Sequence, residues 1–204
     1  QPDLLIAGFF KKTNEEIMNG WMSEQTEYTS FPKPEFMQTI EQLNPRECYV
    51  WRTLYKRSFL NNNAIRFIPS IYFEDIPFSA ECYLKAKKCI ISNCNLYIYR
   101  QRPDSIVSTI NLKKIMDFNI IIARLWKMRT MAKSTKEYTC LMNLIFNTHQ
   151  LQTWFIAHDE ELVDERKSIT DDLKRKVPNL YFCEGIIEHT ESFLYRFFPN
   201  TYLW

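Results

Sequence analysis

The spacing of apolar residues changes near residue 109, and this change divides the chain into two regions. Before it, apolar residues stand in short runs rich in Ile, Phe and Tyr, and residues 96–100 alternate so that Tyr97 and Tyr99 share one face. Beyond it, apolar residues recur at helical spacing, as at Ile115 and Phe118. We therefore predict an α/β region over residues 1–109 and a mainly helical region over residues 110–204.

The same patterns place the individual elements. Strands are predicted over residues 3–10, 89–92 and 96–100, and helices over residues 33–43, 51–61, 77–86, 111–131, 136–157, 160–176 and 185–198.

Composition excludes several classes of function. The 204 residues, 46% of them hydrophobic, can bury one substantial core, and a net charge of +2 gives no general argument for a nucleic-acid partner. The three glycines stand alone, so the chain has no glycine-rich phosphate loop. The six cysteines show no C-x-x-C pairing and the three histidines no metal-ligand spacing, so no metal site is predicted. No apolar run is long enough to predict a membrane-spanning helix.

An acidic pair, Glu74 and Asp75, stands between the aromatic residues Tyr72 and Phe73 and the helix-opening Pro77. A carboxylate at a strand-to-helix corner is a candidate general base, because it can face a cleft while its backbone stays fixed. The same pattern is a common helix start, where the aspartate caps free N–H groups. The pattern alone leaves both interpretations open.

The segments around this pair resemble a known family. Residues 49–60 read YVWRTLYKRSFL, residues 63–67 read NAIRF, and residues 96–106 read LYIYRQRPDSI. In this order and spacing they closely resemble the second half of the catalytic domain of bacterial family 2 glycosyltransferases, the GT-A-fold enzymes that build capsule, exopolysaccharide and lipopolysaccharide. The resemblance covers about residues 3–108. It implies an α/β fold, the C-terminal part of a GT-A domain with few strands, followed by the helical region.

The resemblance also implies an activity. Such enzymes transfer a sugar, with inversion, from a nucleotide-diphosphate sugar to a saccharide or lipid-linked acceptor. Asp75 then takes the role of general base. Glu74 is expected to be a structural or acceptor-orienting partner, because adjacent residues on an extended backbone point opposite ways unless the chain turns between them.

Family members carry the nucleotide-holding strand and an Asp-x-Asp metal motif before the matched part. Magnesium or manganese is therefore expected in the intact enzyme, with ligands mostly outside this chain. The isolated chain is expected to be inactive for the same reason.

Further candidates concern substrate binding. The resemblance implies that Arg100, Arg102 and Ser105 neutralise the leaving nucleotide, since a guanidinium suits phosphate oxygens. Arg100 is alternatively a partner of the acidic pair. Trp51 and Tyr55, one turn apart in the predicted helix, form either a sugar-stacking platform or part of the core. Arg52 and Lys56 have the same spacing of one turn in the predicted helix and are candidates for lining the acceptor cleft.

The sequence departs from the family at two positions. Thr53 stands where a lysine is usual, which puts any contact from that lysine in doubt. Ser70 stands where a glycine is usual, so we expect that the turn there does not need a positive φ.

Alternatives in function and location remain open on sequence alone. A non-catalytic domain that binds a glycan or a partner on a transferase-derived scaffold is the main alternative, and a helical interaction module is another. Retention of the acidic pair with Arg100 and Arg102 favours the enzyme. We expect a cytoplasmic protein. Its aromatic C-terminus is suited either to peripheral contact at the inner face of the cell membrane or to packing on the protein's own core, and the sequence leaves both interpretations open. Residues 3–10, an inner strand in the parent fold, are expected to leave an exposed edge open to self-association.

Overall fold

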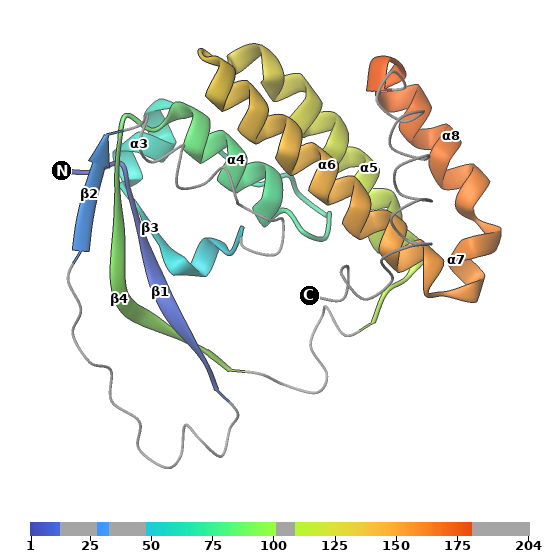
Figure 1. Cartoon of the computed structure of the whole chain (residues 1–204), viewed down its shortest axis with the longest axis horizontal. Coiled ribbons are helices and arrows are strands. Elements are labelled where there is room, and N and C mark those ends of the chain that lie inside the picture. The colour runs from blue at the N-terminus through green and yellow to red at the C-terminus, as the bar shows by residue number, and fades with distance from the viewer. Residues whose placement is uncertain (13–27, 33–47, 101–108, 181–204) are drawn as a thin grey trace.

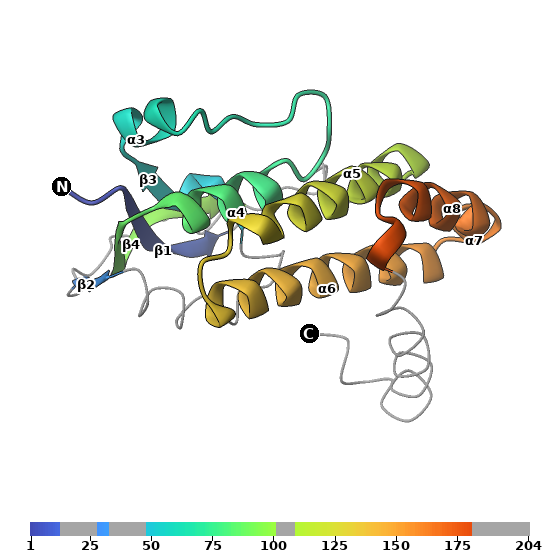
Figure 2. The ribbon, with the colours of Figure 1, turned by 90° about the horizontal axis from the view of Figure 1, so that it is seen from above.

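The computed structural model describes residues 1–12, 28–32, 48–100 and 109–180, in which a small sheet and a layer of helices lie on either side of α4 (Figures 1 and 2). The elements are β1 (Leu4–Lys12), β2 (Tyr28–Pro32), η2 (Val50–Arg52), β3 (Thr53–Tyr55), α3 (Arg57–Asn62), α4 (Asp75–Lys85), β4 (Lys88–Arg100), α5 (Leu112–Met128), η4 (Arg129–Met131), α6 (Thr135–Ala157), α7 (Glu160–Asp164), α8 (Arg166–Lys176) and η5 (Pro178–Leu180). This mixture confirms an α/β fold. The helices predicted over residues 33–43 and 185–198 lie outside the described residues.

The described sheet has the strand order β2-β4-β1-β3. β1 and β4 are parallel, whereas β3 is antiparallel to β1 and β2 is antiparallel to β4. Register shifts occur on either side of Gly8, and such irregularities bend a ribbon, as the curve of β4 in Figure 1 illustrates. Because β1 pairs with both halves of β4, the strands predicted over residues 89–92 and 96–100 are one continuous strand.

β1 is an inner strand over Leu4–Ile6, where β3 and β4 pair with it on opposite sides. Leu4 and Ile6 are buried, as expected for an inner strand. The expectation that β1 leaves an open edge is therefore wrong for this stretch. Among the described strands the outer ones are β2 and β3, and self-association stays a prediction.

The prediction of one helix over residues 51–61 is also wrong. The turn η2 leads into β3, and only then does α3 begin. Thr53 is buried whereas Leu54 is 63% exposed, the alternation of a strand. β1 supplies the backbone partners for Thr53–Tyr55, and this long-range pairing outweighs the local helical spacing. Trp51 and Tyr55 consequently share no helix face.

The long helices confirm the predictions made from periodicity. The side chain of Asn111 caps α5 by accepting a hydrogen bond from Lys114 N–H at 3.0 Å, and Ser134 caps α6 by accepting one from Glu137 N–H at 3.2 Å. The helix predicted over residues 160–176 is divided at Glu165 into α7 and α8. Apolar spacing is similar with or without this break, so the sequence pattern did not reveal it.

α5, α6 and α8 share a buried polar network as well as an apolar core. Asn119 Nδ2 donates to the carbonyl of Ile169 at 2.9 Å and to Asp172 Oδ2 at 3.0 Å. Gln152 Nε2 donates to Asn119 Oδ1 at 2.7 Å and to the carbonyl of Ile115 at 3.0 Å. Buried amides are costly without partners, so these bonds favour one packing of the three helices.

α4 packs against both layers. Ile76, Ala80 and Leu84 lie at helical spacing and join the core formed with α5, α6 and α8. Phe78 and Cys82, on another face, join the core beneath the sheet. The start of α4, where the acidic pair lies, is thus fixed between the sheet and the helical layer.

Candidate functional site

The acidic pair lies in a sharp turn that begins α4. Phe73 has a left-handed backbone with φ 58°, and Glu74 has φ −60° and ψ −18°. The carbonyl of Phe73 accepts a hydrogen bond from Ile76 N–H at 3.2 Å, which closes the turn around Asp75. Glu74 occupies the N-cap position without a side-chain capping bond. The backbone therefore turns at the pair, and the two side chains need not point opposite ways, as they would on an extended strand.

The electrostatics of Asp75 differ from those of a helix cap. Burial, and next the negative charge of Glu74, raise the pKa of Asp75 from its ordinary 3.8 to about 7, although the N–H groups of Asp75 and Ile76 act in the opposite direction. A carboxylate that only caps a helix has a lowered pKa, because N–H groups and the helix dipole stabilise its charge. A carboxyl group with a pKa near 7 is suited to exchanging protons at neutral pH. This favours a functional role, and the role of base stays a prediction.

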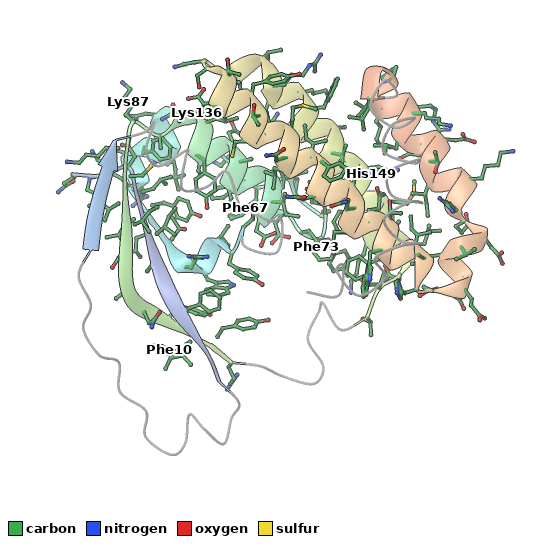
Figure 3. The ribbon with its side chains drawn as sticks, in the orientation of Figure 1. Phe10, Phe67, Phe73, Lys87, Lys136 and His149 are labelled. Carbon is green, nitrogen blue, oxygen red and sulfur yellow. The ribbon has the colours of Figure 1, made fainter. Side chains whose placement is uncertain are left out.

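An exposed aromatic ring lies near the same end of α4. Phe67 is 45% exposed and stacks on Phe78, with ring centroids 4.0 Å apart and planes at 13°. Phe78 stands three residues after Asp75, on a neighbouring position of the helix surface. Figure 3 shows Phe67 and Phe73 near the start of α4. Phe67 lies in a loop, where no periodicity in the sequence indicates its neighbours or a role in a site.

Trp51 belongs to an aromatic cluster beside the paired strands β1 and β4. It stacks on Tyr97 with centroids 4.4 Å apart, on Tyr99 at 5.3 Å and on Tyr49 at 4.7 Å, and Phe9 contacts it edge-on at 4.8 Å. The predicted common face of Tyr97 and Tyr99 is confirmed, since both rings contact the same indole. Tyr97 is 39% exposed, so the cluster reaches the surface.

Tyr55 lies apart from this cluster. Its ring contacts Phe78 edge-on, with centroids 5.4 Å apart. Burial strongly raises the pKa of the Tyr55 hydroxyl. The structure therefore separates the two aromatic residues that the sequence placed on one helix face, and Tyr55 packs against the core beneath the sheet.

Of the predicted basic residues, Arg52, Lys56 and Arg100 belong to the described part of the chain. Arg52 Nε donates to the carbonyl of Ala7 at 3.1 Å, and its guanidinium lies 5.6 Å from the centre of the Phe9 ring. Arg100 is exposed at the end of β4 and forms no ion pair with Glu74 or Asp75 within the described part of the chain. Arg102 and Ser105 lie outside the described residues.

The loop before the acidic pair corrects one expectation. Ser70 has φ 62°, so this turn does adopt the left-handed backbone that a glycine adopts at little cost. Lys113 Nζ donates to the carbonyl of Ser70 at 3.1 Å, and Asp117 Oδ2 accepts a hydrogen bond from Tyr72 N–H at 2.9 Å. The spacing of Lys113 and Asp117, four residues apart on a predicted helix, indicates an ion pair. Nothing in the sequence indicates their contacts with the loop.

Among the described residues, no group of three or more His, Cys, Asp and Glu side chains is placed to hold a metal ion. Within the same ranges, no helix is both long and apolar enough to cross a membrane.

Comparison with known proteins gives partial matches. No protein-family model matches the sequence. The chain is 30% identical over 121 residues to the uncharacterized glycosyltransferase EpsJ of Bacillus subtilis (strain 168), a match that spans 57% of this chain and 34% of EpsJ. The fold is similar to the crystal structure of S. aureus TarS 1–349 in complex with UDP-GlcNAc, with a TM-score of 0.57 and 15% identity, over 86% of this chain and 49% of that one.

The chain thus spans about a third of EpsJ and about half of the TarS chain. The match to EpsJ shows homology to a glycosyltransferase over part of the sequence, and the match to TarS shows a similar fold. The match to EpsJ thus supports a glycosyltransferase-related function, whereas the match to TarS bears on the mixed α/β fold alone.

Proposed function

We propose that this chain is part of an inverting glycosyltransferase of family 2 with a GT-A fold, and that Asp75 is its general base. The observation that carries the proposal is the carboxyl group of Asp75 at the start of α4, with its pKa raised to about 7 in a chain homologous to a glycosyltransferase. The alternative, a non-catalytic glycan-binding domain, gives no reason for a carboxyl group poised to titrate near neutral pH.

The proposed reaction follows from the role of a base in inversion. Asp75 takes the proton of an acceptor hydroxyl while the hydroxyl oxygen forms a bond to the anomeric carbon of the donor sugar. On the opposite face of that carbon, the bond to the nucleoside diphosphate breaks and the diphosphate leaves with the electron pair. The anomeric configuration is inverted, and Asp75 afterwards releases its proton to solvent.

The substrate classes are part of the proposal. TarS was crystallised with UDP-GlcNAc, which supports a nucleotide-diphosphate sugar as donor. For the acceptor we propose a saccharide or lipid-linked saccharide in cell-surface polysaccharide synthesis. Phe67 offers an exposed ring near Asp75, and an aromatic face packs well on the C–H face of a pyranose.

Other groups act on the leaving nucleotide in this proposal. Arg100, with Arg102 and Ser105, is proposed to neutralise the departing phosphates. In the intact enzyme, we propose that a divalent ion, Mg²⁺ or Mn²⁺, is held mainly by residues outside this chain. The described residues of this chain contain no cluster fitted to a metal ion.

The test is turnover by the intact protein that contains this chain. Release of nucleoside diphosphate is measured over a panel of UDP- and GDP-sugars with Mn²⁺, with water or added oligosaccharides as acceptors. Asp75→Asn keeps size and hydrogen bonding but cannot accept the proton, so kcat should fall by roughly 10² to 10⁴ with the donor KM little changed. NMR of the product should show an inverted anomeric centre.

Two results bear against the proposal. Near-normal turnover by folded Asp75→Asn would remove Asp75 as base. Absence of turnover with every donor, accompanied by saturable binding of oligosaccharides in calorimetry, would favour the non-catalytic glycan-binding domain.

A further inference from the structure

The turn that carries Asp75 is held from the neighbouring helix α5 by two hydrogen bonds. Tyr72 N–H donates to Asp117 Oδ2 at 2.9 Å, and Lys113 Nζ donates to the carbonyl of Ser70 at 3.1 Å. Both contacts join residues more than forty positions apart in the sequence. They act on the backbone immediately before the acidic pair.

A ring contact from α5 holds the next residue. The ring of Phe73 stacks on Phe118, with centroids 4.7 Å apart and planes at 26°, and Phe118 is fully buried. A non-glycine residue with φ 58° is strained, so tertiary contacts must maintain it. The Phe73 carbonyl in turn accepts the N–H of Ile76, which is buried in the same core as Phe118. The backbone of Asp75 thus lies between two residues that pack on the helical core.

Asp117 is the unusual member of this contact. It is 1% exposed, and Lys113 Nζ donates to its two carboxylate oxygens at 2.5 and 2.6 Å, while the Lys113 side chain is 56% exposed. Removing a carboxylate from water is unfavourable, and the buried neighbours of Asp117 on α5, such as Phe118 and Ile121, are apolar. What the carboxylate adds is an oriented acceptor for the N–H of Tyr72.

We propose that Asp117 is a positioning residue, which fixes the turn at Tyr72 and thereby the placement of Asp75 toward the acceptor hydroxyl. The proposal rests on the function proposed above, in which Asp75 is the base. A base displaced by a fraction of an ångström from its proton donor loses much of its effect, so the rigidity of this turn bears directly on the rate. Asp117 itself touches no reacting atom in this account.

The test compares Asp117→Ala with Asp117→Asn in the intact protein. Alanine leaves the Tyr72 N–H without its acceptor, so kcat for nucleoside diphosphate release should fall roughly 10- to 100-fold with the donor KM within about twofold. Asparagine keeps a carbonyl oxygen in the same place and should restore most of the lost rate. Unchanged kcat in the folded alanine variant, or no rescue by asparagine, would overturn the proposal.

A second measurement does not depend on turnover. In a ¹³C-carboxyl NMR titration, the pKa of Asp75 is expected near 7 in the native protein and lower in Asp117→Ala, because a loosened turn admits water to the carboxylate. An unchanged titration of Asp75 in that variant would contradict the positioning role. If Asp75→Asn retains turnover while this titration moves, the proposed function fails and the positioning contact stands.

α5 also offers a matched control for lost stability. Arg124 pairs with Glu81 of α4 at 2.8 Å, near the other end of α4. Arg124→Gln breaks this tie between the same two helices without touching the turn at Tyr72. It should lower the melting temperature and leave kcat and the titration of Asp75 unchanged. An equal loss of kcat in Arg124→Gln would show that general loosening, and not the contact of Asp117, explains the effect.

If Asp117→Ala does not fold, hydrogen exchange of the Tyr72 amide in the native protein tests whether Asp117 holds this turn. The Tyr72 amide should exchange as slowly as the amides within α5, because its bond to Asp117 opens only when the loop leaves the helix. Rapid exchange at Tyr72 would overturn the proposal.

Discussion

Replacing Asp75 with asparagine should stabilise the fold at neutral and alkaline pH, although it removes the proposed base. Burial and the charge of Glu74 raise the pKa of Asp75 from 3.8 to about 7, so within this range the folded protein holds a proton that the unfolded chain has lost. The folded state binds more protons, and its stability therefore falls as pH rises through this window. Asparagine carries no charge and is free of this effect.

The magnitude follows from the same pKa. Raising a pKa by about 3 corresponds to about 4 kcal/mol, which is the upper bound on the cost of the ionised carboxylate above pH 7. Below about pH 4 the carboxyl group is protonated in both states and the cost disappears. Asp75→Asn should therefore be about as stable as the native protein near pH 4 and more stable, by up to about 4 kcal/mol, near pH 8.

Urea unfolding of both proteins in parallel at several pH values measures this difference. The free energy of unfolding of Asp75→Asn minus that of the native protein should grow between pH 4 and pH 7 and then level off. A helix cap behaves differently, because asparagine caps about as well as aspartate and the difference stays small. A difference that does not change with pH, or a less stable variant at pH 8, would refute the account of Asp75 as a destabilised carboxylate.

Two further predictions concern the charge of Glu74 and the polar network between α5 and α6. Glu74→Gln removes the charge that, after burial, raises the pKa of Asp75, so the acidic limb of the pH profile of kcat/KM should move to lower pH. If this limb does not move, the charge of Glu74 is not a cause of the raised pKa. Gln152→Leu removes the hydrogen bonds from Gln152 to Asn119 Oδ1 and to the carbonyl of Ile115, and it leaves the buried Asn119 Oδ1 without this donor. Urea unfolding should therefore show a loss of about 1–3 kcal/mol, and a loss below about 0.5 kcal/mol would contradict a stabilising network.

The sequence by itself determined the elements whose pattern reflects one buried face. The helical spacing of apolar residues predicts α5 and α6, and capping residues stand at the starts of these helices, at Asn111 and Ser134. The common face of Tyr97 and Tyr99 followed from strand alternation in the same way. The acidic pair was also visible, because an aromatic run, two carboxylates and a proline indicate a corner before a helix.

Only the tertiary structure decided the features that depend on distant residues. Thr53–Tyr55 became a strand because β1 supplied hydrogen-bond partners, and Ser70 adopted a left-handed backbone that Lys113 helps to hold. The raised pKa of Asp75 likewise depends on burial by surrounding elements, and its turn on contacts from α5. Local patterns report which face of an element is apolar. They do not report which groups from elsewhere in the chain will exclude water from a carboxylate or accept a particular N–H, and these contacts set the chemistry of the site.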